Sequence, residues 1–150
     1  MEHDVLAGEL FRKGYNCSQA VLLAFSDVTG LDQRTALAVS SSFGGGMGRL
    51  REVCGAVSGA FMVAGLLWGG YDPNHRDAKA EHYKLIQRLA ARLKEENGSI
   101  ICRELLGLPG ASAPVPEERT ADYYRRRPCE AYIRTAARII DEEIKSRGTE

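Results

Sequence analysis

Residues 53–68 read VCGAVSGAFMVAGLLW and contain no charged side chain. A helix that is apolar on every side is typical of the centre of a helical bundle. A membrane-spanning helix needs about 20 predominantly apolar residues. This run is shorter, and it contains Cys54, Ser58 and three glycines. We therefore predict a buried core helix here, and no insertion into a membrane.

On both sides of this run the sequence is helical in pattern, with no alternating strand. Capping residues and apolar spacing predict helices at about residues 5–13, 17–30, 32–42, 52–68, 74–97, 99–106 and from 128 onward. The pattern predicts an all-α fold, a single-domain helical bundle of about six or seven helices that covers residues 1–150.

Two segments interrupt the helical pattern. Residues 44–48 read Gly-Gly-Gly-Met-Gly, which lets the backbone adopt positive φ or approach another group closely. Residues 107–127 form a long connection with three prolines, which we expect to be a lid or a partly mobile segment.

Composition narrows the class of protein. With 150 residues and 44% hydrophobic residues, the chain can bury a core without disulfides. Its net charge of zero argues against a nucleic-acid partner, and the short patch of Tyr123, Tyr124 and residues 125–127 is too small to change that. The first residues lack the pattern of a secretory signal, so we predict a cytoplasmic protein.

The four cysteines, Cys17, Cys54, Cys102 and Cys129, are each predicted at or within about one turn of a helix start. Unpaired backbone N–H groups and the helix dipole favour the thiolate there, which is the form that binds metals and attacks disulfides. In a reducing cytosol such cysteines indicate metal binding or redox activity rather than a disulfide framework.

Spacing alone does not bring the cysteines together. No pair has the C-x-x-C spacing of thioredoxin-like motifs, zinc ribbons or common ferredoxins. Free cysteine is also among the most buried residue types, so four separate packing thiols are the alternative to one shared site.

Glycines near Cys54 are the candidate cofactor-binding residues. Gly55 and Gly59 lie four residues apart on one helix face, where they let another helix or an inorganic cluster approach the backbone. Gly45 and Gly46 add N–H groups that could bond sulfur or an anion. The same small-residue face could support a homodimer.

Several spaced motifs carry a resemblance to a known family. They are GYNCSQAV at residues 14–21, FGGGMG at 43–48, CGAVSG at 54–59, CRELLG at 102–107, and Cys129. In their order and spacing they resemble the C_GCAxxG_C_C family of redox-active proteins, which has four characteristic cysteines and a CGAxxG motif. The likeness covers about residues 14–140.

The resemblance implies a redox-active protein whose four cysteines, Cys17, Cys54, Cys102 and Cys129, hold an iron–sulfur cluster. Such a protein would exchange electrons with a redox protein partner or with a small-molecule oxidant or reductant.

Three chemistries remain open for the four thiols. They can complete the ligand set of a [2Fe–2S] or [4Fe–4S] cluster for electron transfer. Pairs of them can cycle between dithiol and disulfide, helped by Arg103 and by the arginines at 125–127. The third possibility is structural: a Cys₄ zinc site, or a helical module without a cofactor that binds a partner.

Overall fold

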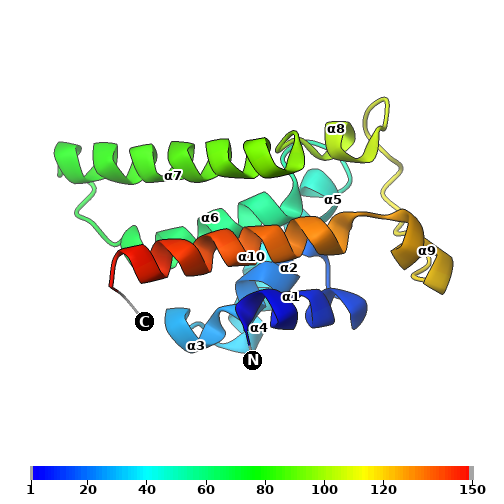
Figure 1. Cartoon of the computed structure of the whole chain (residues 1–150), viewed down its shortest axis with the longest axis horizontal. Coiled ribbons are helices and arrows are strands. Elements are labelled where there is room, and N and C mark those ends of the chain that lie inside the picture. Colours follow the sequence, from blue (N-terminus) through cyan, green and yellow to red (C-terminus); the bar gives the residue numbers. More distant parts are fainter. Residues whose placement is uncertain (1, 149–150) are drawn as a thin grey trace.

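The computed structural model describes residues 2–148, and it is all-α, as predicted (Figure 1). The helices are α1 (His3–Arg12), α2 (Cys17–Ala24), α3 (Ser26–Thr29), α4 (Gln33–Ser40), α5 (Gly44–Met47), α6 (Gly55–Trp68), α7 (Arg76–Asn97), α8 (Cys102–Leu106), α9 (Ala121–Arg126) and α10 (Cys129–Ser146). A 3-10 turn, η1 (Ser41–Phe43), follows α4. Residues 2–148 contain no strand.

All seven predicted helices are present, with α2 and α3 both inside the one predicted at 17–30, and the short helices α5 and α9 are additional. The predicted helix at 17–30 is divided, because Phe25 leaves helical geometry at φ −99° and ψ 16° with its side chain fully buried. The predicted helix at 52–68 begins later, at Gly55, since the residues before it pair with another segment instead.

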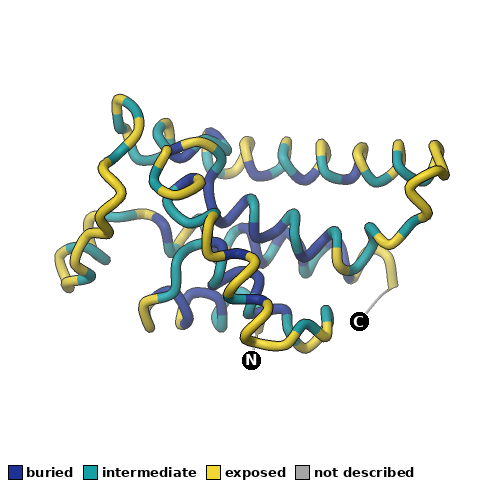
Figure 2. Tube along the Cα trace, turned by 180° about the vertical axis from the view of Figure 1, so that it is seen from behind, coloured by how far each residue is buried: buried dark blue, intermediate teal, exposed yellow. Residues whose placement is uncertain are grey.

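The charge-free run forms α6, and α6 lies in the core as predicted (Figures 1 and 2). Its buried residues include Ala56, Val57, Ala60, Val63 and Ala64. A Cβ atom at Gly59 would lie 2.9 Å from the Ser18 carbonyl oxygen, so the absence of a side chain there lets α6 pack directly on α2. Within residues 2–148, no helix is both long enough and apolar enough to cross a membrane.

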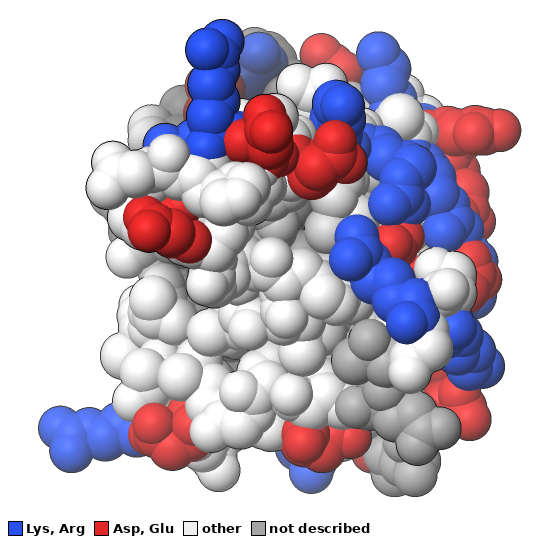
Figure 3. Space-filling model, turned by 90° about the vertical axis from the view of Figure 1, so that its left-hand side faces the viewer, with Lys and Arg blue, Asp and Glu red and all other residues white. Residues whose placement is uncertain are grey.

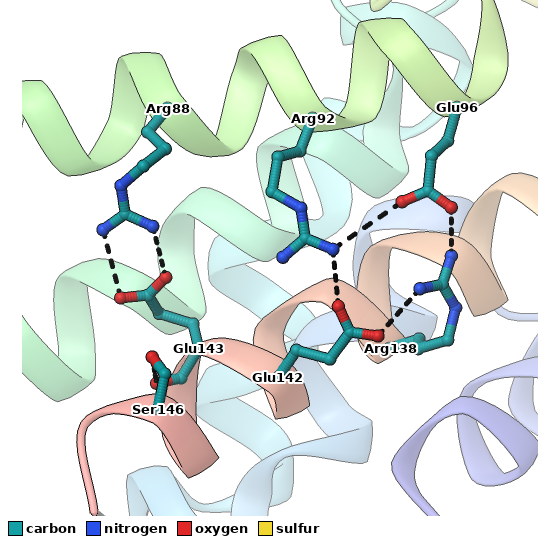
Figure 4. A network of polar contacts seen from close by, with 7 residues as sticks. All are labelled: Arg88, Arg92, Glu96, Arg138, Glu142, Glu143 and Ser146. Carbon is teal, nitrogen blue, oxygen red and sulfur yellow. Dashed lines mark hydrogen bonds and ion pairs between the residues drawn. The ribbon is translucent and has the colours of Figure 1, made fainter.

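Helix α7 is fixed to α10 by a network of ion pairs (Figure 4). Glu143 is only 5% exposed, and its carboxylate accepts hydrogen bonds from Arg88 Nη1 at 2.6 Å and from Arg147 Nε at 2.7 Å. The network also contains Arg92, Glu96, Arg138 and Glu142. These pairs hold the long helix along the bundle, so that the chain after it returns to the end where α6 begins.

The two ends of the bundle differ. Figure 3 shows the end on the left of Figure 1, where charged side chains surround a central area formed by other residues. At the right-hand end of Figure 1, α6, α8 and α10 begin and the connection at 107–127 passes by. The cysteines lie at this second end.

Candidate functional site

The four cysteines stand at four helix starts, as the sequence predicts. Cys17, Cys102 and Cys129 are the first residues of α2, α8 and α10, and Cys54 is the N-cap residue of α6. All four line one cavity of about 70 Å³. The fold therefore brings together thiols that are far apart in the sequence.

A capping box positions Cys17. The Asn16 side chain accepts a hydrogen bond from the Gln19 N–H at 2.9 Å, and the Gln19 side chain accepts one from the Asn16 N–H at 3.1 Å. Reciprocal bonds of this kind fix the first turn of a helix. The first residue of α2 is therefore held in place by its own sequence.

An isolated antiparallel bridge positions Cys54 and Cys102. Val53 pairs with Ile101, the Cys54 N–H donates to the Ile100 carbonyl at 2.8 Å, and the Cys102 N–H donates to the Glu52 carbonyl at 2.6 Å. Side chains alternate along extended backbone, so Cys54 and Cys102 lie on the same side of this bridge. This pairing, which the sequence did not reveal, aligns the starts of α6 and α8.

Two of the predicted glycines allow close approach to the thiol-bearing residues. A Cβ atom at Gly46, where φ is +69°, would lie 2.6 Å from the Cβ atom of Cys102. A Cβ atom at Gly55 would lie 3.1 Å from that of Cys17. Gly59 instead serves the packing of α6 on α2. A cofactor-binding role for these glycines stays a prediction.

The Cys17 and Cys129 thiols interact with each other, and no disulfide links the cysteines in residues 2–148. The interaction with Cys17, helped by the positive charges of Arg127 and Arg51, lowers the pKa of Cys129 against the effect of burial. The same interaction, together with burial, raises the pKa of Cys17 well above its usual value.

Burial has the opposite effect on Cys54. It raises the pKa of this thiol to about 12, although the nearby backbone N–H groups of Ala56 and Val57 act in the other direction. The pKa is thus lowered only at Cys129 among these three thiols, through Cys17 and the nearby arginines, so a bias of helix starts toward the thiolate stays a prediction.

Arg51 places a positive charge close to one of the thiols. Its side chain is buried, with Nη1 3.6 Å from the Cys102 sulfur and Nε donating to Ser112 Oγ at 2.9 Å. Arg119 also lines the cavity and stacks over the ring of Phe11, 4.5 Å from its centroid. Sequence reasoning missed both arginines, because neither is part of a motif.

The arginines that the sequence did single out behave differently. Arg127 lines the cavity, and Arg103 pairs with Glu52 at 3.2 Å. Arg125 and Arg126 both pair with the exposed Asp122. Of the run at 125–127, one residue thus contributes to the site and two belong to the surface.

Residues 15–143 match the model of a family described as "Putative redox-active protein (C_GCAxxG_C_C)". The chain belongs to the C_GCAxxG_C_C family. The match includes all four cysteines and the CGAVSG segment at 54–59. No curated protein and no solved structure gives a significant match.

In this C_GCAxxG_C_C chain, the connection at 107–127 forms one wall of the cysteine cavity. It contains α9, and it contributes Arg119, Tyr123 and Arg127 to the lining. The Ser112 N–H donates to the Arg49 carbonyl at 2.9 Å, and Arg119 Nη1 donates to the Phe11 carbonyl at 2.9 Å. The segment is thus anchored at several points, and its opening as a lid stays a prediction.

The cysteines of this C_GCAxxG_C_C site do not converge on one point. Within residues 2–148, no three His, Cys, Asp or Glu side chains are grouped closely enough to hold a single metal ion. A zinc ion needs its sulfur ligands at about 2.3 Å. An iron–sulfur cluster distributes its thiolates over several iron atoms, so its ligands can stand farther apart.

Proposed function

We propose that this protein is an electron-transfer protein whose four cysteines bind an iron–sulfur cluster. The observation that supports the proposal is that Cys17, Cys54, Cys102 and Cys129 line one cavity, in a chain whose family is described as redox-active. When bound, a cluster supplies one-electron oxidation and reduction.

The surroundings of the thiols fit a negatively charged group. Thiolates and the cluster they hold carry negative charge, and hydrogen bonds to the sulfurs tune its reduction potential. Arg51 Nη1 lies 3.6 Å from the Cys102 sulfur, and Arg127 lines the same cavity.

Apolar and aromatic side chains limit the access of water to the thiols. The lining of the cavity includes Phe11, Leu105, Leu106, Tyr123 and Tyr132. Such a lining lowers the local dielectric and strengthens the effect of the nearby arginines. We infer that electrons reach the site from a redox protein partner or from a small-molecule oxidant or reductant.

A second function is favoured by the interaction of the Cys17 and Cys129 thiols, which lowers the pKa of Cys129 and raises the pKa of Cys17. In this alternative, the Cys129 thiolate attacks a substrate disulfide, forms a mixed disulfide and releases the first substrate thiolate. Cys17 then loses its proton and attacks Cys129, which forms the Cys17–Cys129 disulfide and releases the second thiolate. Two electrons pass from the protein to the substrate.

Four single Cys→Ser variants, purified without oxygen, separate the two proposals. For a cluster, we expect iron, acid-labile sulfide and visible charge-transfer absorption in the wild type, and a large loss in every variant. For the dithiol alternative, we expect no iron, a Cys17–Cys129 disulfide after diamide treatment, and unchanged disulfide formation in the Cys54→Ser and Cys102→Ser variants.

Each proposal has a result that overturns it. Wild-type protein without iron or sulfide contradicts the cluster, and four unchanged thiols after diamide contradict the dithiol. Zinc in place of iron, with collapse of thermal stability in each variant, would instead support the structural alternative.

A further inference from the structure

A second cavity adjoins the cysteine cavity and has a different character. Its volume is about 190 Å³, and its lining includes Arg49, Arg51, Arg119 and Tyr123. Arg51, Arg119 and Tyr123 also line the cysteine cavity, so these side chains form the wall that the two cavities share. We refer to this second space as the outer cavity.

The three arginines of the outer cavity have no carboxylate partner among residues 2–148. The Arg49 side chain donates through Nε to the Ala113 carbonyl at 2.7 Å, and Arg51 donates to Ser112 and the Cys102 sulfur. Most other arginines described pair with a carboxylate, and the exceptions, Arg34 and Arg76, are exposed on helices.

Arg119 is held by neutral groups instead of a carboxylate. Its guanidinium donates to the carbonyl oxygens of Phe11 at 2.9 Å and Tyr15 at 3.2 Å, and it stacks over the Phe11 ring. These contacts fix its position and leave its charge uncompensated. A buried or half-buried charge without a counterion is unfavourable, so positions of this kind indicate a ligand of opposite charge.

The acidic side chain that lines the outer cavity is already engaged. Glu117 Oε2 accepts a hydrogen bond from Arg127 Nη2 at 2.6 Å. The pair is neutral as a whole, so Glu117 does not offset the charges of Arg49, Arg51 and Arg119. The outer cavity keeps an excess of positive charge.

The thiols do not account for all of this charge. Arg51 lies beside the Cys102 sulfur and can serve as a counterion to a thiolate or a cluster. Arg49 lines the outer cavity and is not part of the cysteine cavity. Arg49 therefore borders a space that none of the four cysteines lines.

We propose that the outer cavity binds a small oxyanion, such as a compound with a carboxylate, phosphate or sulfate group. The planar guanidinium matches the geometry of these groups and binds them through paired hydrogen bonds. Pockets for drug-sized ligands measure about 300–1,000 Å³, so a volume of about 190 Å³ suits a smaller molecule. The binding of this oxyanion does not depend on the proposed function of the cysteine cavity.

Calorimetric titration tests the proposal. Inorganic phosphate, sulfate and malonate are each titrated into the full chain, purified without oxygen, at an ionic strength held constant with chloride. We expect at least one of them to bind, and the variant Arg49→Gln to weaken that binding by about tenfold or more, as the loss of a charge-assisted hydrogen bond implies.

Arg34→Gln is the matched control, because it removes the same charge from an arginine that also lacks a carboxylate partner within residues 2–148 and is exposed on α4. We expect this variant to bind as the wild type does. The proposal is overturned if none of the three anions binds, if Arg49→Gln binds as tightly as the wild type, or if both variants lose affinity equally.

A measurement on the wild type covers the case in which Arg49→Gln does not fold. Phenylglyoxal modifies accessible arginines, and mass spectrometry locates the modification. We expect the bound anion to protect Arg49 and not Arg34, and equal modification of Arg49 with and without the anion contradicts the proposal. The iron content of the same sample is recorded separately, so anion binding without iron would refute the cluster and leave this inference standing.

Discussion

The substitution Gly46→Ala gives the sharpest test of how the site is built. Gly46 has φ +69°, and a Cβ atom there would lie 2.6 Å from the Cys102 Cβ and 2.9 Å from both the Arg51 Cα and the Glu52 nitrogen. Two of these three atoms belong to the backbone of the segment that pairs with residues 100–103, so they cannot rotate away. We expect the substitution to displace Cys102 and to destabilise the fold.

The size of the effect follows from two contributions. A side chain in the left-handed region costs about 1–2 kcal/mol, and forcing an extra carbon into a packed site costs about 1–3 kcal/mol. Gly48 also has a positive φ, +62°, but a Cβ atom there would meet nothing within 4 Å. Gly48→Ala should therefore lose about 1–2 kcal/mol, and Gly46→Ala about 2–5 kcal/mol.

Urea unfolding followed by circular dichroism measures both free energies of unfolding. The effect of alanine on the unfolded chain is common to both variants, so it cancels in the difference. We expect Gly46→Ala to be less stable than Gly48→Ala by about 1–3 kcal/mol. Equal losses would refute the reasoning, because they would mean that the contact of Gly46 with the cysteine segment has no energetic weight.

Two further predictions concern the bundle. Hydrogen bonds from Arg88, opposed by burial and supported by Arg147, lower the pKa of Glu143. The ionised Glu143 carboxylate therefore stabilises the fold at neutral pH, and this stabilisation is lost as the pH falls below about 4.5 toward the lowered pKa. Glu143→Gln should lower the free energy of unfolding by about 1–3 kcal/mol at pH 7. It should also make this free energy depend less on pH in the acid range, and an unchanged pH dependence would contradict the prediction. Gly59→Ala should destabilise by about 1–3 kcal/mol because its Cβ would meet the backbone of α2 at 2.9 Å. Gly65→Ala is the control on the same helix: a Cβ atom there would meet nothing within 4 Å, so it should stabilise the fold by about 0.5–1 kcal/mol. Equal shifts of the melting temperature in Gly59→Ala and Gly65→Ala would contradict the close packing of α6 on α2.

The long helices were predictable because their signals are local and repeated. The charge-free run at 53–68 indicated the core helix α6, and the apolar stripe of Ile133, Ala136 and Ile140 indicated α10. Short helices such as α9 lack such repetition. Thr120 does cap α9, accepting a hydrogen bond from the Tyr123 N–H at 3.1 Å, but a single cap is a weak signal in a segment rich in proline.

The site was predictable in its thiols and not in its charges. The cysteines are rare residues with a definite chemistry, and the glycine run at 44–48 indicated positive φ, which Gly45 and Gly46 adopt. The bridge between Val53 and Ile101 joins segments far apart in sequence and has no alternating pattern. Arg51 and Arg119 acquire their roles from tertiary contacts, and nothing beside them in the sequence distinguishes them from surface arginines.

The electrostatics of the site link its occupancy to the stability of the fold. Arg51 is 5% exposed and has no carboxylate partner within residues 2–148, so its burial is unfavourable unless a negative group faces it. The cavity needs the starts of α2, α6, α8 and α10 together, so a group held by all four thiols binds the folded chain and not the unfolded one. Such binding adds stability, about 4 kcal/mol at a ligand concentration 1,000 times its Kd. Under the proposed function, the fold that assembles the thiols is therefore also stabilised by the cluster that they hold.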